Sequence, residues 1–127
     1  MANTVWAYAT MKHKAPQLYD AVSERAINRL DAFNSQEMAN TVWAYATLGH
    51  KASDLFDAVS EKAINKLDTF NSQGLVNTVW AYATVKHKAP ELFDAVSEKA
   101  IYKLDAFNPQ ELASTVWAYG NCETQSS

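Results

Sequence analysis

The apolar residues of this chain recur at intervals of three and four, with polar residues between them. Leu75, Val79 and Tyr82 are separated by four and then three residues, which is the spacing of one face of an amphipathic α-helix. A second segment of this kind follows after a short polar turn, with Leu92 and Val96 four residues apart. The pattern therefore predicts pairs of antiparallel helices joined by short turns.

The helix pair is repeated along the sequence. The string NTVWAYAT occupies residues 3–10, 40–47 and 77–84, and STVWAY follows at 114–119, so the period is 37 residues without insertion or deletion. A fixed period of this length is typical of a solenoid, so we predict an all-α fold, a right-handed α-solenoid of 37-residue helix-turn-helix repeats with about seven helices. The expected boundaries are a solenoid over residues 1–121, with repeats at about 1–34 (partial), 35–71, 72–108 and 109–121 (partial), and a disordered polar tail at 122–127.

Capping residues mark the start of the first helix in each pair. In FNSQEM, Asn34 is the expected N-cap and Glu37 closes a capping box. In FNPQEL, Pro109 falls on the first helical position, where its missing N–H costs nothing. Gly74 replaces the capping glutamate in the middle copy, so we expect that helix start to lose the reciprocal bond and to fray most.

A helical wheel assigns the side chains of each helix to a buried or an open face. For the first helix, the opposite, polar face is expected to carry Asn77, Ala81, Thr84 and Lys88. The tryptophans are interpreted as core residues that fill the space between helices, and no stacked aromatic rings are expected on the concave surface. The wheel expects these residues to be buried: Leu75, Val76, Val79, Trp80, Tyr82 and Ala83 in the first helix, and Leu92, Phe93, Val96, Ala100, Ile101 and Leu104 in the second.

A polar residue recurs on the open face of the first helix. Asn3, Asn40 and Asn77 hold this position, and Ser114 holds it in the last copy. Asparagine is unfavourable inside a helix, so the repeated position calls for a reason. Two interpretations remain open: each amide bonds to the adjacent helix or is simply inherited by duplication, or the row contacts a ligand along the concave surface.

The sequence ANTVWAYATLGHKA, followed by an amphipathic ELFDAVSEKA, resembles the helical-hairpin repeats of organellar RNA-binding proteins. The resemblance is to the pentatricopeptide class and, closer in length and in the Trp-Ala-x-Ala core, to octotricopeptide and heptatricopeptide repeats; tetratricopeptide arrays are related. It implies RNA-base contact by Asn3, Asn40, Asn77 and Ser114, and an organelle, mitochondrion or plastid, as the location. The small apolar residue that would sandwich a base is replaced here by Glu37, Gly74 or Glu111.

Charged residues separate into two sets of turns. The turns after the first helices contain the sequences KHKAP and GHKAS and no acid, whereas the turns before them contain LDAFNSQE and its variants and no base. Stacked hairpins would then have a basic edge and an acidic edge despite a net charge of -3. The expected phosphate contacts are Lys12, Lys14, Lys51, Lys86 and Lys88. An equally weighted interpretation is that these bases only complement helix C-termini.

Composition and spacing argue against other functions. Identical residues repeated along a rod make no unique catalytic site, and His13, His50 and His87 lie one repeat apart, about 8 to 10 Å, too far to share a zinc ion. We therefore expect a non-catalytic binding module with no cofactor, no metal and no membrane span, located inside the cell. Single-stranded RNA is the favoured partner, and a protein or peptide scaffold that holds an acidic partner is the alternative.

The two ends of the array are expected to expose apolar surface. The expected residues are Trp6 at one end and Leu112, Val116 and Trp117 at the other. End-to-end self-association into a homo-oligomer would follow from such surfaces.

Overall fold

The computed structural model describes residues 16–121, and these residues form helices joined by short turns. Each 3₁₀ helix, labelled η, lies in the turn that leads to the next long helix. The elements are α2 (Pro16–Asn28), η1 (Leu30–Ala32), α3 (Ser35–Leu48), α4 (Ser53–Ile64), η2 (Leu67–Thr69), α5 (Ser72–Val85), α6 (Pro90–Lys103), η3 (Leu104–Ala106) and α7 (Pro109–Gly120).

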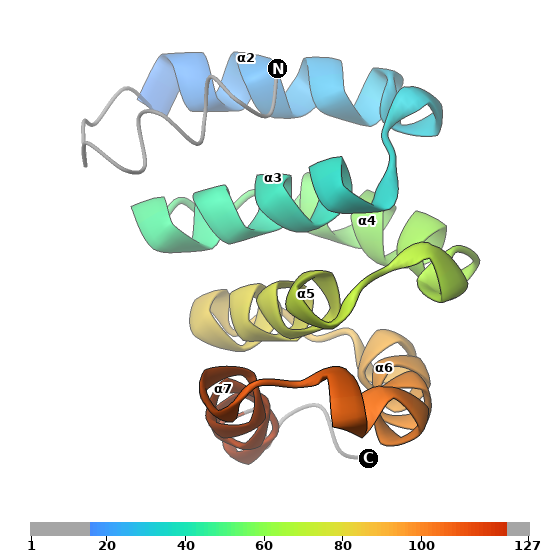
Figure 1. Ribbon diagram of the computed structural model, residues 1–127. Helices are drawn as coiled ribbons and strands as arrows, with labels where there is room; N and C mark the ends of the chain where they lie inside the picture. The colour runs from blue at the N-terminus through green and yellow to red at the C-terminus, as the bar shows by residue number, and fades with distance from the viewer. Residues whose placement is uncertain (1–15, 122–127) are drawn as a thin grey trace.

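The helices form two layers (Figure 1). Helices α3, α5 and α7 lie one beside the next in the first layer, and we call them the A helices. Helices α2, α4 and α6 form the second layer in the same way, and we call them the B helices. This arrangement confirms the all-α solenoid that the period predicts, and it turns each repeat position into a row that crosses the layer.

The caps of the A helices follow the predicted pattern. Asn34 accepts a hydrogen bond from the Glu37 N–H at 2.8 Å, and the Glu37 carboxylate accepts one from the Asn34 N–H at 2.9 Å, which completes a capping box. Asn108 and Glu111 repeat this box at α7. At α5, Asn71 accepts from the Gly74 N–H at 2.7 Å, and glycine has no side chain to return the bond. The lost reciprocal bond is confirmed, and fraying there stays a prediction.

Tyrosines tie each A helix to the preceding B helix. The Tyr45 hydroxyl donates to the Tyr19 carbonyl at 2.6 Å, and the Tyr82 hydroxyl donates to the Phe56 carbonyl at 2.5 Å. Both tyrosines are fully buried in the core. Each bond satisfies a buried hydroxyl that would otherwise destabilise the fold by about 1–3 kcal/mol.

Several burial assignments from the helical wheel are wrong. Ala81, expected on the open face, is fully buried, because α5 packs against A helices on both sides and a small residue allows close approach. Trp80, expected in the core, is only partly buried. Ile101 and Leu104, also expected in the core, are exposed because no following hairpin covers α6 in the described residues.

Candidate functional site

Four side chains form a line along the accessible side of α5. Gln73, Asn77, Trp80 and Thr84 are spaced by four, three and four residues, so they lie on one face of the helix. Gln73 is exposed and the other three are partly buried, with the Thr84 hydroxyl itself buried. Helix α3 carries the same line, and α7 carries its first three positions with serine in place of asparagine. We call these rows the amide–tryptophan stripes, and their members are Gln36, Asn40, Trp43 and Thr47 on α3, Gln73, Asn77, Trp80 and Thr84 on α5, and Gln110, Ser114 and Trp117 on α7.

The amides of the stripes are not used by the fold. Asn40 and Asn77 are partly buried, and within residues 16–121 neither side chain forms a hydrogen bond. The bond to the adjacent helix, which the sequence left open, is therefore absent from the described structure. A side-chain amide without a partner can both donate and accept hydrogen bonds, so it can bind a polar ligand.

Grooves between neighbouring A helices bring these amides together. Gln36, Asn40, Gln73 and Asn77 line the groove between α3 and α5. The groove between α5 and α7 has a volume of about 230 Å³ and is lined by Gln73, Asn77 and the corresponding residues Gln110 and Ser114. Amide side chains therefore recur one helix along, and the second groove is also lined by the Glu111 carboxylate.

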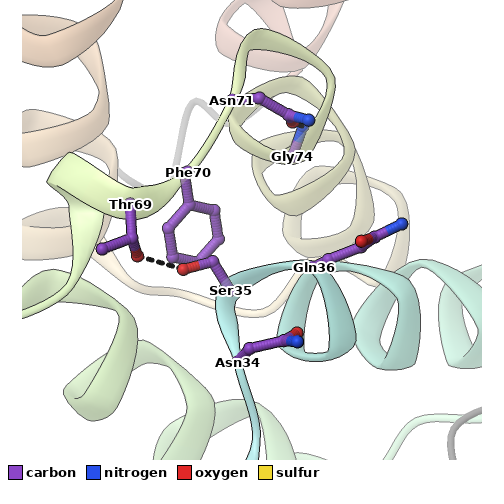
Figure 2. Close-up of a pocket in the computed structure, with 7 residues that line it drawn as sticks. All are labelled: Asn34, Ser35, Gln36, Thr69, Phe70, Asn71 and Gly74. Atoms are coloured by element: carbon purple, nitrogen blue, oxygen red, sulfur yellow. Dashed lines mark hydrogen bonds between the residues drawn. The ribbon is translucent and has the colours of Figure 1, made fainter.

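The amino-terminal end of the first groove is shown in Figure 2. Ser35 and Thr69 are joined there by a hydrogen bond between their hydroxyls, and Phe70 lies beside them. The side-chain oxygens of Asn34 and Asn71 each accept a helix-capping hydrogen bond there. Gln36 makes no such bond, and its side chain extends away from the Ser35–Thr69 pair. The glutamines at this repeat position were missed from the sequence, although their identical recurrence as Gln36, Gln73 and Gln110 was the available signal.

The tryptophans lie on the stripes beside the amides. The Trp80 and Trp117 ring centroids are 6.4 Å apart and the ring planes are inclined by 33°. Trp117 is 45% exposed, and Trp43 and Trp80 are partly buried. Trp43 and Trp80 pack against the core, as predicted, but they are not fully buried, and the tilted Trp80–Trp117 pair was not predicted. Each A helix packs against its neighbours in the layer, and one side of it stays uncovered. The indoles on this side are therefore partly exposed.

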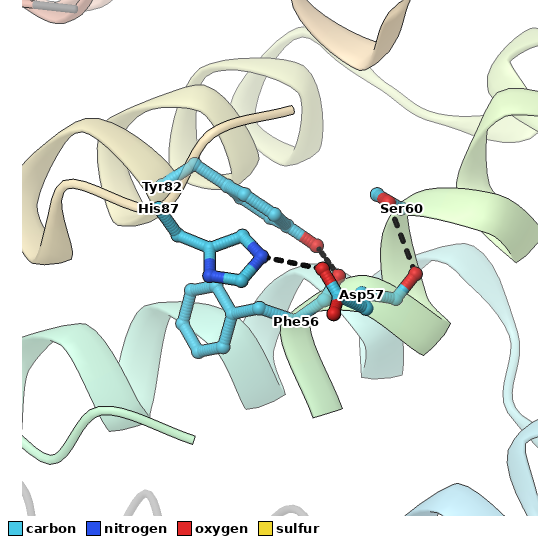
Figure 3. A network of polar contacts seen from close by, with 5 residues as sticks. All are labelled: Phe56, Asp57, Ser60, Tyr82 and His87. Atoms are coloured by element: carbon cyan, nitrogen blue, oxygen red, sulfur yellow. Dashed lines mark hydrogen bonds and ion pairs between the residues drawn. The ribbon is translucent and has the colours of Figure 1, made fainter. Parts of the chain in front are cut away.

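The histidines in the turns after the A helices pair with aspartates of the preceding B helix. His50 lies 2.9 Å from the Asp20 carboxylate, and His87 lies 2.6 Å from that of Asp57 (Figure 3). The predicted histidine contribution to a basic edge is therefore offset by aspartates 30 residues earlier. These pairs join consecutive hairpins rather than offering free charge.

Lysines in the same turns remain available. Lys51, Lys86 and Lys88 are exposed and form no ion pair within the described part of the chain. They follow the carboxyl ends of the α3 and α5 stripes directly in sequence. The other predicted contact residues, Asn3, Trp6, Lys12 and Lys14, lie outside the described residues.

The opposite edge carries both signs of charge. Lys62 forms an ion pair with Asp31, and Lys99 forms one with Asp68. Each lysine hydrogen bond, reinforced by the lysine charge, lowers the pKa of its aspartate. The prediction of an acidic edge without bases is wrong, because B helices end at this edge and bring their lysines to the preceding hairpin.

The chemical capacity of the described region is that of a binding surface. Residues 16–121 contain no group of three His, Cys, Asp or Glu side chains arranged to hold a metal ion. In the same residues, no helix has the length and apolarity to cross a membrane. The recurring features of the A helices and of the turns after them are neutral amides, indoles and lysines.

Comparison with known proteins identifies a family. The family model described as RNA-editing substrate-binding complex 6 protein matches residues 1–126, so the chain belongs to this family. No curated protein matches the sequence significantly. Membership supports the RNA-related part of the sequence resemblance.

Proposed function

We propose that this protein is a non-catalytic module that binds single-stranded RNA across the amide–tryptophan stripes of α3, α5 and α7. The observation that carries the proposal is the recurrence of unbonded amides next to partly exposed indoles on three neighbouring helices. The family name, which refers to RNA editing and substrate binding, is consistent with this role. The octotricopeptide-like comparison and an organellar location rest on the sequence resemblance, and we adopt both as part of the proposal.

The stripes match the chemistry of an unpaired base. A base presents a π-face and a hydrogen-bonding edge, and both are accessible only when the strand is single. Stacking of one base on an aromatic side chain contributes about 1–3 kcal/mol and tolerates any base. In each stripe the indole would support the ring, and the neighbouring Gln and Asn amides would bond to its edge.

The lysine turns suit the phosphate backbone. Lys51, Lys86 and Lys88 lie next in sequence after the carboxyl ends of two stripes, where a strand that crosses the A layer would pass. Each phosphate neutralised on a single strand changes the slope of log K against log salt by about 0.7. Three lysines therefore account for a slope of about 2, which predicts weak, salt-sensitive binding.

The amide stripes can be tested by binding of a fluorescently labelled single-stranded RNA at low salt. The double variant Gln73→Ala, Asn77→Ala should bind about 5- to 150-fold more weakly, because two hydrogen bonds of about 0.5–1.5 kcal/mol each are removed. The matched control is Gln17→Ala, Asn28→Ala, which removes the same two side chains from the exposed surface of α2. The control should bind like the original chain.

The lysine turns can be tested by the salt dependence of the same binding. Replacing Lys51, Lys86 and Lys88 by Gln should reduce the salt slope by about 2. Replacing Lys62, Lys66 and Lys99 by Gln removes the same number of charges at the opposite edge, and it should leave the salt slope unchanged. No binding of single-stranded RNA at low salt would refute the proposal. Tighter binding of an acidic peptide than of RNA would instead favour the protein scaffold.

A further inference from the structure

Apolar side chains are concentrated at the end of the solenoid formed by α6, η3 and α7. Val116 is 73% exposed and Ile101 is 68% exposed, although both belong to helices that bury their other apolar residues. We call this surface the end face, and its members are Ile101, Tyr102, Leu104, Leu112, Val116 and Trp117. Large apolar residues clustered in this way mark an interaction site.

The earlier repeats show what covers this surface. Leu67 corresponds to Leu104 and is buried where α6 packs against α4 and η2. Val79 corresponds to Val116 and is fully buried. In the earlier repeats, the surface that corresponds to the end face is thus covered by the next hairpin along the chain. Tyr102 is the exception, since the corresponding residues are asparagines, and nothing in the repeat explains it.

Two aspartates on or beside the end face have the repeat positions of aspartates that, in the earlier repeats, form ion pairs with the next hairpin. Asp31 and Asp68 pair with a lysine of the following B helix, and Asp105 has the same repeat position. Asp57 pairs with the histidine of the following turn, and Asp94 corresponds to it. Within residues 16–121, Asp94 and Asp105 form no ion pair. The end face therefore combines an uncovered apolar surface with two acids placed to accept bases.

The complementary surface lies on α2. Arg25 occupies the repeat position of Lys62 and Lys99, the lysines that reach back to the preceding hairpin, and it is exposed. Leu18 and Val22 are only partly buried, whereas the corresponding residues of α4 and α6 are fully buried or nearly so. Helix α2 thus presents the features with which α4 and α6 dock on their predecessors. His13 has the repeat position of His50 and His87 but lies outside the described residues.

We propose that the end face binds α2 of a second copy of this chain, in a head-to-tail contact that continues the B layer. The Arg25 guanidinium of one copy pairs with Asp105 of the other, as Lys62 pairs with Asp31 and Lys99 with Asp68. The apolar end-face residues cover Leu18 and Val22. Because the two surfaces differ, each dimer keeps one free surface of each kind, so association is open-ended.

Sedimentation velocity over a concentration series tests the contact. The original chain should sediment faster as its concentration rises. Asp105→Arg and Arg25→Asp should each weaken association about 2- to 5-fold or more, because an attractive exposed pair becomes repulsive. An equimolar mixture of the two variants should recover association, since the new arginine at position 105 then faces the new aspartate at position 25 of the other chain.

Two further variants make the test decisive. Glu61→Arg makes the same change in charge at an exposed site on α4 and should associate like the original chain. Val116→Asp should abolish association while RNA binding persists, since Val116 lies outside the stripes. A chain that stays monomeric at every concentration, or association that Val116→Asp does not reduce, would overturn the proposal. A mixture that gains nothing over the separate variants would exclude the Arg25–Asp105 pairing.

Discussion

Helices α5 and α7 share the segment TVWAY, preceded in both by the same glutamine and leucine positions, and differ in what surrounds them. Leu75 and Val79 of α5 are fully buried, whereas Leu112 and Val116 of α7 are 41% and 73% exposed. Tyr82 and Tyr119 both donate to a carbonyl of the preceding B helix, at 2.5 and 2.7 Å, but only Tyr82 is fully buried. The difference teaches that in a solenoid the next hairpin, not the residue type, determines burial.

The consequence is energetic as well as geometric. An identical side chain contributes little to folding in α7 and much in α5, because stabilisation follows the apolar area removed from water. Matched substitutions in the two helices therefore measure the effect of the neighbouring hairpin with the local sequence held nearly constant.

The largest expected difference in the free energy of unfolding is between the variants Val79→Asp and Val116→Asp. At Val79 a charge enters the fully buried core without a partner, and the free energy of unfolding should fall by about 4 kcal/mol or more. At Val116 the change should stay within about 0.5 kcal/mol, because the side chain is exposed. Urea unfolding monitored by circular dichroism gives both values. Equal losses in the two variants would show that α7 is covered in solution.

The sequence predicted what belongs to one repeat and failed where neighbouring repeats meet. The helix starts were predicted correctly from the capping pair Asn34 and Glu37 and from Pro109, because helix capping depends only on residues close in sequence. Exposure of Leu112 and Val116 was also predicted, and it is confirmed. Ile101 and Leu104 were assigned to the core from the wheel of a single helix, which contains no information about whether a further hairpin follows.

The second expected effect concerns alkaline pH. Burial raises the pKa of Tyr82 well above its ordinary value, with a further contribution from the charge of Asp57, and burial raises the pKa of Tyr45 as well. The folded state therefore holds these protons more tightly than the unfolded chain. The stability that these two groups contribute is fully present below about pH 10 and is lost as the pH rises further, by about 1.4 kcal/mol per pH unit for Tyr82, with a loss of the same sign from Tyr45.

Unfolding free energies measured between pH 9 and pH 11.5 check this expectation. Tyr82→Phe should make the decline above about pH 10 shallower, because one of the two tyrosines with a raised pKa is removed. A decline of the same steepness in Tyr82→Phe would assign the alkaline loss to other groups.

A smaller difference is expected between Tyr82→Phe and the matched variant Tyr119→Phe at neutral pH. Tyr82→Phe removes a buried hydrogen bond to the Phe56 carbonyl and should destabilise the protein by about 1–1.5 kcal/mol. Tyr119→Phe removes the corresponding bond to the Phe93 carbonyl at a partly buried site and should cost about 0.5 kcal/mol, because water can replace it. Thermal and urea unfolding at pH 7 measure both. A larger loss at Tyr119 would mean that the α6–α7 contact carries more stability than burial implies.

The candidate site was only partly predictable for a related reason. Asn40 and Asn77 stood out because a polar residue recurs on a helix face, and the structure leaves their amides unbonded within the described residues. Trp80 was assigned to the core because a large aromatic side chain was expected to fill the space between helices, but it is only partly buried. The ion pairs of His87 and Lys99 join residues 30 and 31 positions apart, and helix geometry within one unit does not reveal them.

The smallest expected effect concerns how the A helices end. Helix α3 ends at Gly49 with φ +71°, a left-handed conformation that suits glycine, and α5 ends with Lys86 in the same conformation at φ +58°. Lys86→Gly should therefore stabilise the protein by about 0.5–1 kcal/mol, because the strain of a side chain at positive φ is removed. At the end of α7, Asn121 has φ -101°, so Asn121→Gly should give no gain and a slight loss from the greater freedom of the unfolded chain. Thermal unfolding of the two variants measures the contrast. A gain in Asn121→Gly equal to that in Lys86→Gly would show that α7 ends in solution as the interior A helices do, which would extend the resemblance between α5 and α7 from sequence to structure.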